Sequence, residues 1–406
     1  MNVKIIIDLK MNKKLSAVFY AINGTGIGHI SRLNNIAEDM AWLCQHMDIE
    51  PRFEFLTTSD APFVVTQFPT IKLPSKTTIK ALGLPMKSTT AHIKTQIVTF
   101  LNAKAPDGLI LDTNPKGSYQ EFPFLKSLAK RTVFIDRARK MESITRQVKN
   151  NISLFDRVIV PETADTGASY PFHPNISFAG KIHGFKPEYS LSRDEVRTLF
   201  GIQQHEQLIY LSSGGGGDTN SEAFLGKWLD VVAEVIPHAR VIVGYGPLYK
   251  GVIHYANRQA IPFTGTRVNR YFAGVDLAIS AAGYNSIEEL QAANVPTLFY
   301  GLEKGFDDQF DRIRQLQNKN LCTLGDINAP QESLHKALTR HSIVKAELKR
   351  QPYSHGSAIA AGQLLETLLM PKTFMLPATA ITRAVSTLKS IRSNRMQSLL
   401  DQNQAA

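Results

Sequence analysis

Residues 23–29 read Asn-Gly-Thr-Gly-Ile-Gly-His, and they follow a run of β-branched, aromatic and small residues at 16–22. The run predicts a strand, and the residues after His29 predict a helix. Three glycines between a strand and a helix let the backbone pass close to a bulky ligand. A second glycine cluster, Ser-Ser-Gly-Gly-Gly-Gly at 212–217, lies at a second predicted strand–helix junction half a chain later. Two such junctions predict two α/β domains that face one cleft, with a nucleotide-type ligand between them.

Length and composition are those of a globular protein with two domains. The 406 residues are 43% hydrophobic and 20% charged, which argues against disorder. No run approaches the roughly 18–20 consecutive apolar residues of a membrane span, and the N-terminal apolar run is too short for a signal peptide. Cys44 and Cys322 lie far apart, so the sequence indicates neither a disulfide framework nor a zinc site. We therefore expect a cytoplasmic protein.

The chain is basic, with a net charge of +11 and a pI near 9.5. This charge favours acidic partners such as phosphorylated ligands, anionic lipid or nucleic acid. After residue 370 the pattern becomes a basic amphipathic tail at 371–406. The tail is compatible with contact at the inner face of a membrane, with packing on the body, or with disorder. Lysines and arginines are spread along the whole chain without an RNA-binding motif, so a nucleic-acid partner is not expected.

Predicted strands and helices alternate along both halves, which indicates two Rossmann-like, doubly wound α/β domains. We place the boundary in the Gly-, Pro- and Lys-containing segment 180–192, giving an acceptor-side domain at 1–185 and a donor domain at 186–370. Ser192 and Glu195 form a predicted capping box at the start of a helix. The predicted strands are short apolar runs, as in parallel sheets covered on both faces: 16–22, 53–57, 108–111, 132–135, 157–160, 208–211, 240–243, 277–280 and 297–299.

The first glycine loop does not have the full dinucleotide fingerprint. Its spacing is G-x-G-x-G, and the nearest acidic residue after the second strand, Asp60, comes too late to bind a ribose. A nicotinamide or flavin dinucleotide is therefore disfavoured. His29 stands at the predicted helix N-terminus, where a neutral imidazole can act as a general base. The alternative is that His29 caps the helix or orders the loop.

The second glycine loop is predicted to bind phosphate. Ser213 and the glycines at 214–217 offer backbone N–H groups to an anion, and a helix starting near Asn220 adds its positive end. The loop lacks the Gly-Lys-Ser/Thr ending of a P-loop, so ATP hydrolysis of that kind is not indicated.

A third element spans residues 279–290, where a strand ends at Gly283 and a helix starts near Asn285 or Ser286. The start of this helix could receive a diphosphate, and Glu289 one turn on could accept ribose hydroxyls. Gln309 begins another predicted helix and could contact a sugar. The alternative is that Glu289 and Gln309 are ordinary surface residues.

This third element resembles the donor-site signature of the GT-B glycosyltransferases, and it is most similar to the family 28 type. The first glycine loop ending in histidine is also similar to that family. Residues 106–112 with Glu121, and residues 133–137, resemble a branch of predicted glycosyltransferases in the same superfamily. The matching segments occur in the same order along the chain and cover most of residues 14–365.

The resemblance implies specific roles in a two-domain GT-B fold. Glu289 would bind the ribose of UDP, Gln309 would contact the donor sugar, and His29 would face the acceptor. The diphosphate would be held by main-chain groups of two turns: Gly214, Gly215 and Gly216, and Gly283, Tyr284, Asn285 and Ser286. The first loop would form the acceptor side, with Gly24, Thr25, Gly26 and Gly28. The second loop has glycine where the family 28 enzyme has serine and glutamine, so the donor sugar stays open.

We therefore expect an inverting glycosyltransferase that uses a nucleotide sugar, preferably UDP-linked and with UDP-N-acetylhexosamine as one candidate. His29 or Asp112, which ends a predicted strand, would deprotonate the acceptor hydroxyl; a turn cap is the alternative for Asp112. No D-x-D motif occurs, so we expect neither a metal site nor a cofactor, and Lys181 or Arg267 could help neutralise the leaving diphosphate. The acceptor, a lipid-linked sugar or a small molecule, stays open. The alternatives are a nucleotide-sugar hydrolase on the same scaffold, and a basic protein that binds nucleic acid or a membrane surface.

Overall fold

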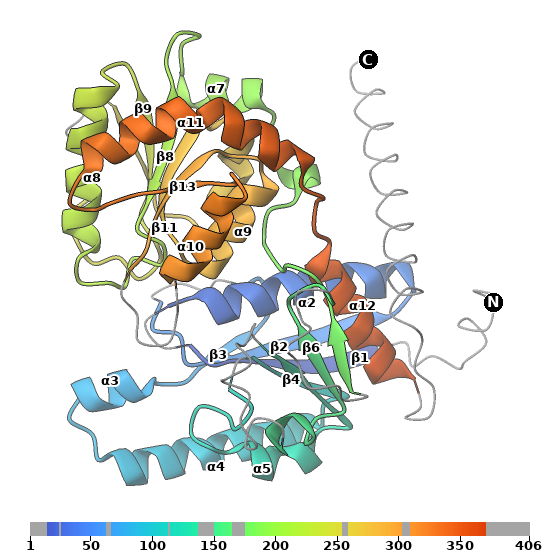
Figure 1. Ribbon diagram of the computed structural model, residues 1–406. Coiled ribbons are helices and arrows are strands. Elements are labelled where there is room, and N and C mark those ends of the chain that lie inside the picture. Colours follow the sequence, from blue (N-terminus) through green and yellow to red (C-terminus); the bar gives the residue numbers. More distant parts are fainter. Residues whose placement is uncertain are drawn as a thin grey trace.

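The structure, a computed structural model, describes residues 14–23, 26–61, 66–112, 114–136, 150–164, 175–253, 259–302 and 309–370. The predicted tail at 371–406 and two residues of the first glycine loop, Gly24 and Thr25, lie outside the described residues. The described chain forms two α/β domains, each built on one parallel sheet (Figure 1). The predicted fold class, two Rossmann-like doubly wound domains, is confirmed.

The first domain has a seven-stranded sheet in the order β3-β2-β1-β4-β5-β6-β7, with all neighbours parallel. Its strands are β1 (Lys14–Ala21), β2 (Glu50–Thr57), β3 (Thr70–Lys72), β4 (Gly108–Asp112), β5 (Arg131–Ile135), β6 (Arg157–Val160) and β7 (Ile176–Phe178).

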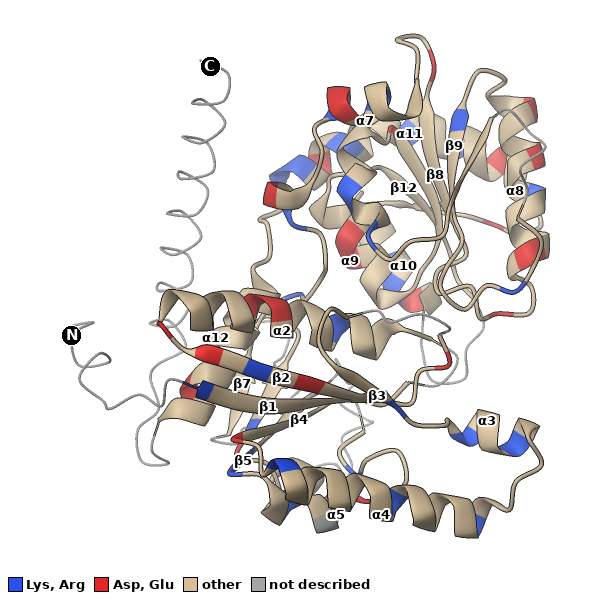
Figure 2. Ribbon diagram, turned by 180° about the vertical axis from the view of Figure 1, so that it is seen from behind, with Lys and Arg blue, Asp and Glu red and all other residues tan. Residues whose placement is uncertain are grey.

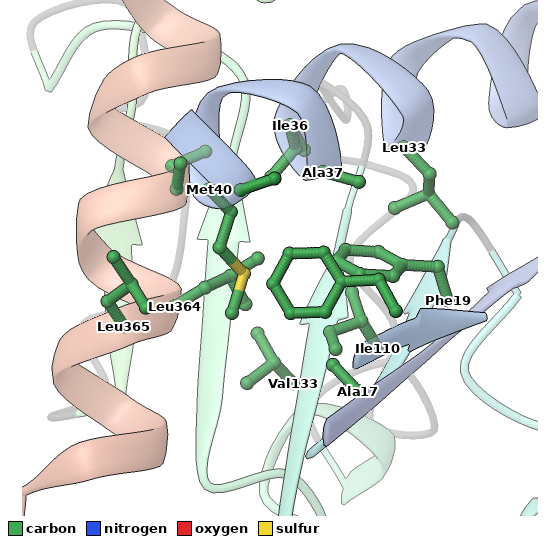
Figure 3. Packing of buried hydrophobic residues seen from close by; sticks show 14 of the residues in the cluster. Ala17, Phe19, Leu33, Ile36, Ala37, Met40, Ile110, Val133, Leu364 and Leu365 are labelled. Atoms are coloured by element: carbon green, nitrogen blue, oxygen red, sulfur yellow. The ribbon is translucent and has the colours of Figure 1, made fainter. Parts of the chain in front are cut away.

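Helices cover both faces of the first sheet. One face packs on α2 (Gly28–His46) and α12 (Gly356–Leu369), and the other on α3 (Lys76–Ala81), α4 (Met86–Lys104) and α5 (Phe122–Leu125) with the 3-10 turn η1 (Lys126–Leu128). In the α2 core, Met40 and Leu33 lie over the Phe19 ring and Ile110 of the central strands (Figure 3). The central strands are apolar on both faces because both faces are covered.

The second domain has a six-stranded parallel sheet in the order β10-β9-β8-β11-β12-β13. Its strands are β8 (Leu208–Ser212), β9 (Arg240–Gly244), β10 (Ala260–Phe263), β11 (Leu277–Ala281), β12 (Thr297–Tyr300) and β13 (Thr323–Leu324). One face carries α8 (Ser221–Val235) and α11 (Pro330–Arg350); the other carries α7 (Arg193–Phe200), η4 (Val268–Gly274), α9 (Tyr284–Ala292) and α10 (Gln309–Asn318). A 3-10 turn, η3 (Pro187–Tyr189), precedes α7. The predicted capping box of α7 is present, since Ser192 and Glu195 bond reciprocally.

The last described helix returns to the first domain. The sequence-based boundary assigns residues 186–370 to the donor domain, but Leu364 and Leu365 of α12 lie in the same core as α2 (Figure 3). Arg157 of β6 also pairs with Glu366 at 2.6 Å. The assignment of α12 to the donor domain therefore needs correction, because its apolar face packs beside α2 in the first domain.

Polar contacts tie α2 to the segment between the domains and to the second domain. Asp39 accepts hydrogen bonds from Lys186 at 2.7 Å and from Ser357 at 2.5 Å. Arg267 of the second domain pairs with Glu38 at 2.8 Å. These contacts fix the second domain against the α2 side of the first.

Candidate active site

The carboxyl ends of the central strands carry the predicted loops. In the first sheet Tyr20 is level with Leu111, so the loop after β1 and Asp112 at the end of β4 lie side by side. In the second sheet Ser280 is level with Ser212, so the second glycine loop and the 282–286 turn are also neighbours. In open α/β sheets, ligands bind in the crevice outside these strand ends.

His29 and Asp112 form a hydrogen-bonded pair. His29 Nδ1 lies 2.9 Å from Asp112 Oδ1; the carboxylate is fully buried, whereas 36% of the imidazole side chain is exposed. Arg32, one turn further along α2, donates to the same carboxylate from Nε at 2.9 Å and from Nη2 at 2.6 Å. The carboxylate is thus bonded by two side chains of α2, and the imidazole stays partly exposed.

The charge state of Asp112 follows from these partners. Burial alone would raise its pKa, but the adjacent Arg32 and His29 outweigh burial and hold the pKa of Asp112 well below its ordinary value. Asp112 is therefore an anion at neutral pH. An anionic carboxylate accepts the Nδ1 proton of His29, and the neutral imidazole then carries its lone pair on Nε2.

Asn23 shapes the first loop, a role that the sequence pattern does not indicate. Its side-chain amide donates to the Gly26 carbonyl at 2.9 Å, and its amide oxygen accepts from the Ile30 backbone N–H at 3.1 Å. Thr58, which follows β2, donates to the Asn23 carbonyl at 2.6 Å. The start of α2, and with it His29, is fixed to two neighbouring strands.

The second loop has a backbone that only glycine adopts easily. Gly214 and Gly216 have φ values of 83° and 76°. Ser212 orders the turn, because its hydroxyl donates to the Gly244 carbonyl at 3.2 Å and accepts from the Gly214 N–H at 3.1 Å. The Ser213 hydroxyl is buried and has no hydrogen-bond partner within the described part of the chain. A buried hydroxyl in that state has its bonding completed by an ordered water or by a polar ligand.

The third turn presents the start of a helix to the same crevice. Gly283 is the N-cap residue of α9, and no described side chain caps this end of the helix. The positive end of the helix dipole therefore lies at the carboxyl end of β11, next to the first glycine loop. Asn285 reaches across to the first domain and donates to the Gly28 carbonyl at 3.3 Å.

All three loops lie together. A Cβ on Gly215 would lie 4.0 Å from the Ile27 main-chain nitrogen, so the second loop faces the first. The structure thus brings the glycines of the second loop and the 283–286 turn to the loop that leads into His29.

Glu289 and Gln309 occupy different environments. Glu289 is half-buried beside the segment between the domains, where Gly184 donates its N–H to Oε1 at 3.2 Å. Burial raises the pKa of Glu289 to about 7, although Gly184 and Asn269 partly offset this effect. Gln309 is buried, and its side-chain oxygen accepts from the Leu302 N–H at 3.0 Å. Gln309 therefore fixes the chain after β12.

The two basic candidates are paired with carboxylates. Lys181 lies 2.8 Å from Glu162 and 3.3 Å from Glu288. Its ammonium group also lies 5.6 Å from the centre of the Tyr284 ring, and Arg32 lies 6.0 Å from that centre. The Tyr284 ring, in the 283–286 turn, thus lies near two cations, Arg32 beside Asp112 and Lys181 beside Glu288. Arg267 lies at the domain contact with Glu38 instead.

No family model and no curated protein sequence matches this chain. Solved structures do match. The glycotransferase of kitacinnamycin is 15% identical, with a TM-score of 0.56 over 87% of this chain and 99% of that one. The chain has the GT-B fold. Medicago truncatula UGT71G1 complexed with UDP-glucose is 14% identical, with a TM-score of 0.57 over 89% of this chain and 99% of that one. MurG of Acinetobacter baumannii is 13% identical, with a TM-score of 0.52 over 85% and 98%.

Metal-ligating side chains do not cluster in the part of the chain that the structure describes. Within it, no three His, Cys, Asp or Glu side chains gather closely enough to hold a metal ion. None of the helices in the described ranges is long and apolar enough to cross a membrane. The expected independence of metal remains a prediction.

Proposed function

We propose that this protein is an inverting glycosyltransferase that moves a sugar from a UDP-linked donor to an acceptor hydroxyl. The observation that carries the proposal is the His29–Asp112 pair placed beside two glycine-lined strand ends of the second domain. A fold alone does not determine chemistry, so the proposal depends on this geometry. The UDP-glucose bound to UGT71G1 supports a UDP-linked donor on this fold.

In the proposed reaction, Nε2 of His29 takes the proton of the acceptor hydroxyl. The acceptor oxygen forms a bond to the anomeric carbon as the bond from that carbon to the diphosphate oxygen breaks, and UDP leaves. Asp112 acts on the reaction through His29: it fixes the tautomer and stabilises the imidazolium that forms. With its carboxylate buried and bonded to His29 and Arg32, Asp112 is the positioning residue and His29 the base.

The leaving diphosphate would be stabilised by main-chain donors, with no cation required. Gly214 turns the loop, since its N–H donates to Ser212. The backbone N–H groups of Gly215, Gly216 and the start of α9 would then face the developing charge, and the Ser213 hydroxyl would bond one phosphate oxygen. Glu289 is proposed to accept the ribose hydroxyls, and Gln309 to hold the backbone that borders the donor sugar. UDP-N-acetylhexosamine is one candidate for the UDP-linked donor.

The experiment is a donor panel read in two ways. UDP, GDP, TDP and their sugars are first screened by thermal shift with EDTA present. Saturation at 100 times Kd stabilises a protein by about 2.7 kcal/mol, and we expect this response from UDP compounds only. The donor that binds is then incubated with and without candidate acceptors. Sugar transfer that depends on an acceptor supports the proposal; free sugar released at the same rate without any acceptor would assign a hydrolase instead.

A further inference from the structure

The first turn of α9 spans the boundary between the two domains. α9 of the second domain lies next to α2 of the first (Figures 1 and 2), and Figure 2 shows the acidic residues of α9 in red. Tyr284, the first residue of α9, donates its hydroxyl to the Pro161 carbonyl after β6 at 3.2 Å. Asn285 donates to the Gly28 carbonyl at the start of α2. Two adjacent residues of the donor-side turn therefore bond to two separate elements of the first domain.

The Tyr284 ring links the donor-side turn to the guanidinium group that holds Asp112. The centre of the ring lies 6.0 Å from the Arg32 guanidinium carbon, and Arg32 donates two hydrogen bonds to the buried Asp112 carboxylate. A cation at this distance from an aromatic ring is attracted to its face, and more strongly where both are removed from water. Arg32 is buried. The position of the donor-side turn is thereby connected, through Arg32, to that of the His29–Asp112 pair.

An ion-pair cluster one turn further along α9 makes a second connection. Glu288 follows Tyr284 by four residues, which places both on one side of the helix. Lys181 Nζ lies 3.3 Å from Glu288 Oε1 and 2.8 Å from Oε1 of Glu162, which belongs to the first domain. The exposed fractions of the two carboxylate side chains are only 9% and 11%. A buried carboxylate of each domain therefore shares one ammonium group, and that group also lies 5.6 Å from the centre of the Tyr284 ring.

Lys181 is held in place by the chain segment that leads into α12. Ser354 donates its hydroxyl to the Lys181 carbonyl at 2.8 Å, and Gly356 packs so closely that a Cβ there would overlap this carbonyl. The Gly180 N–H donates to the Glu162 carbonyl at 2.9 Å. Because the backbone of Lys181 is fixed, its ammonium group sets the distance between α9 and the end of β6. Without this lysine, two buried like charges would face each other across the domain boundary.

We infer that Tyr284 and Lys181 are positioning residues, which fix the donor-side turn in register with the His29–Asp112 pair across the domain boundary. Tyr284 acts through Arg32 and the main chain after β6, and Lys181 acts through the two carboxylates that it joins. The kinetic consequence of this register rests on the proposed function. A sugar bound at the donor-side turn reacts with an acceptor at His29 only when the two are aligned, and a misplacement of about 1 Å can cost about a hundredfold in rate.

The first experiment separates positioning from donor binding. Tyr284→Leu and Lys181→Met should each lower kcat by about 10–100-fold, while the Kd for UDP changes by less than about twofold. Tyr284→Phe keeps the aromatic ring beside Arg32 and should recover most of the loss. A Lys181→Met, Glu288→Gln variant, which removes one of the two facing charges, should recover part of the kcat that Lys181→Met loses.

The controls remove comparable contacts that lie within one domain. Tyr271 is a half-buried tyrosine that packs edge-on against Phe200 and Phe263 in the second domain. Lys104 pairs with Glu54 at 2.7 Å in the first domain. Tyr271→Leu and Lys104→Met should leave kcat within about twofold of the parent, because neither contact joins the two domains.

A second experiment measures the register without any reaction. Cys44 and Cys322 are buried, so spin labels can be directed to exposed positions by Gln96→Cys in the first domain and Asp230→Cys in the second. Paramagnetic resonance should give one narrow distribution of label-to-label distances in the parent and in the control variants. The distribution should be broader or shifted in Tyr284→Leu and Lys181→Met. This measurement still tests the inference if the parent transfers no sugar, a result that would refute only the proposed function.

Three results would overturn the inference. The label-to-label distances in Tyr284→Leu and Lys181→Met could match those of the parent. The kcat of these variants could fall no further than that of Tyr271→Leu and Lys104→Met. A Lys181→Met variant whose affinity for UDP falls as steeply as its kcat would instead assign the ammonium group to the leaving diphosphate.

Discussion

His29 and Arg32 share one carboxylate oxygen: Asp112 Oδ1 lies 2.9 Å from His29 Nδ1 and 2.6 Å from Arg32 Nη2. The two cationic or proton-donating groups lie one turn apart on α2, so a single helix supplies both partners of the β4 carboxylate. The arrangement keeps Asp112 ionised and engages Nδ1 of His29, while 36% of the His29 side chain stays exposed.

The first prediction concerns the base. His29→Ala should lower the rate of sugar transfer by about 10²–10⁴-fold, the usual contribution of a general base, while UDP affinity stays within about twofold. Asp112→Asn should lower the rate by a similar factor because an amide does not stabilise the imidazolium. Initial rates and calorimetric UDP titrations check both. A His29→Ala variant that retains the parental rate would remove His29 from the mechanism.

The second prediction concerns Arg32. Arg32→Met removes both guanidinium hydrogen bonds to the buried Asp112 carboxylate, and breaking a buried ion pair typically costs about 3–5 kcal/mol. We expect a loss of roughly this size in the free energy of unfolding, measured in urea. Arg52→Met is the control: the Arg52–Glu50 pair has both side chains more than half exposed, and exposed pairs contribute about 0–1 kcal/mol. Equal effects of the two substitutions would contradict the account.

The third prediction concerns the pH dependence of stability. The pKa of Glu289 in the folded protein, about 7, is above its ordinary value of 4.5. The resulting stabilisation is fully present below about pH 4.5 and is lost as the pH rises through 7. Relative to Glu289→Gln, the free energy of unfolding of the parent should fall by up to about 3 kcal/mol as the pH rises from about 4.5 to about 7.

Urea unfolding of Glu289→Gln and the parent at pH 5 and pH 7 checks this prediction. Glu195→Gln is the control, and its difference from the parent should be nearly the same at pH 5 and pH 7. Hydrogen bonds from the Ser192 backbone lower the pKa of Glu195 below 4.5, so its stabilisation is present above that pH and is lost only as the pH falls further. If the difference between the parent and Glu289→Gln is the same at both pH values, the burial of Glu289 is not as described.

The fourth prediction concerns the second glycine loop. A Cβ on Gly246 would clash with the Gly214 carbonyl, whereas one on Gly226 in α8 meets nothing within 4 Å. Gly246→Ala should therefore displace the loop and weaken UDP binding by at least about tenfold, equivalent to 1.4 kcal/mol. Gly226→Ala should leave UDP binding unchanged and stabilise the helix by about 0.5–1 kcal/mol. If both variants bind UDP with equal affinity, the second glycine loop does not bind the diphosphate.

The nine strands predicted from sequence are the interior strands of the two sheets. The four strands that the sequence does not predict, β3, β7, β10 and β13, are the four sheet edges. Interior strands are buried on both faces and read as apolar runs, but edge strands are short and mostly half-exposed, so the same signal is weak in them. The packing of α12 on the first domain is not predicted either, because nothing in its own pattern says which of two sheets it covers.

The candidate site also contains features that the sequence predicts and features that it does not. Glycine loops at strand–helix junctions are recognisable in the sequence because glycine is needed where the backbone must turn tightly. Arg32 is missed, although its spacing of three residues from His29 places both on one face of the predicted helix. The Lys181 cluster joins residues 162, 181 and 288, which are distant in sequence, and no local pattern brings them together. The proposed roles of Glu289 and Gln309 stay predictions.

The most direct test of the account is a calorimetric titration of the full chain with UDP in the presence of EDTA. If main-chain amides hold the diphosphate without a cation, UDP should bind saturably and its affinity should not change when Mg²⁺ is added. Glu289→Ala, which removes the proposed ribose acceptor, should weaken UDP binding at least about tenfold. The absence of any binding heat or thermal shift at millimolar UDP, or equal affinity in Glu289→Ala, would contradict it.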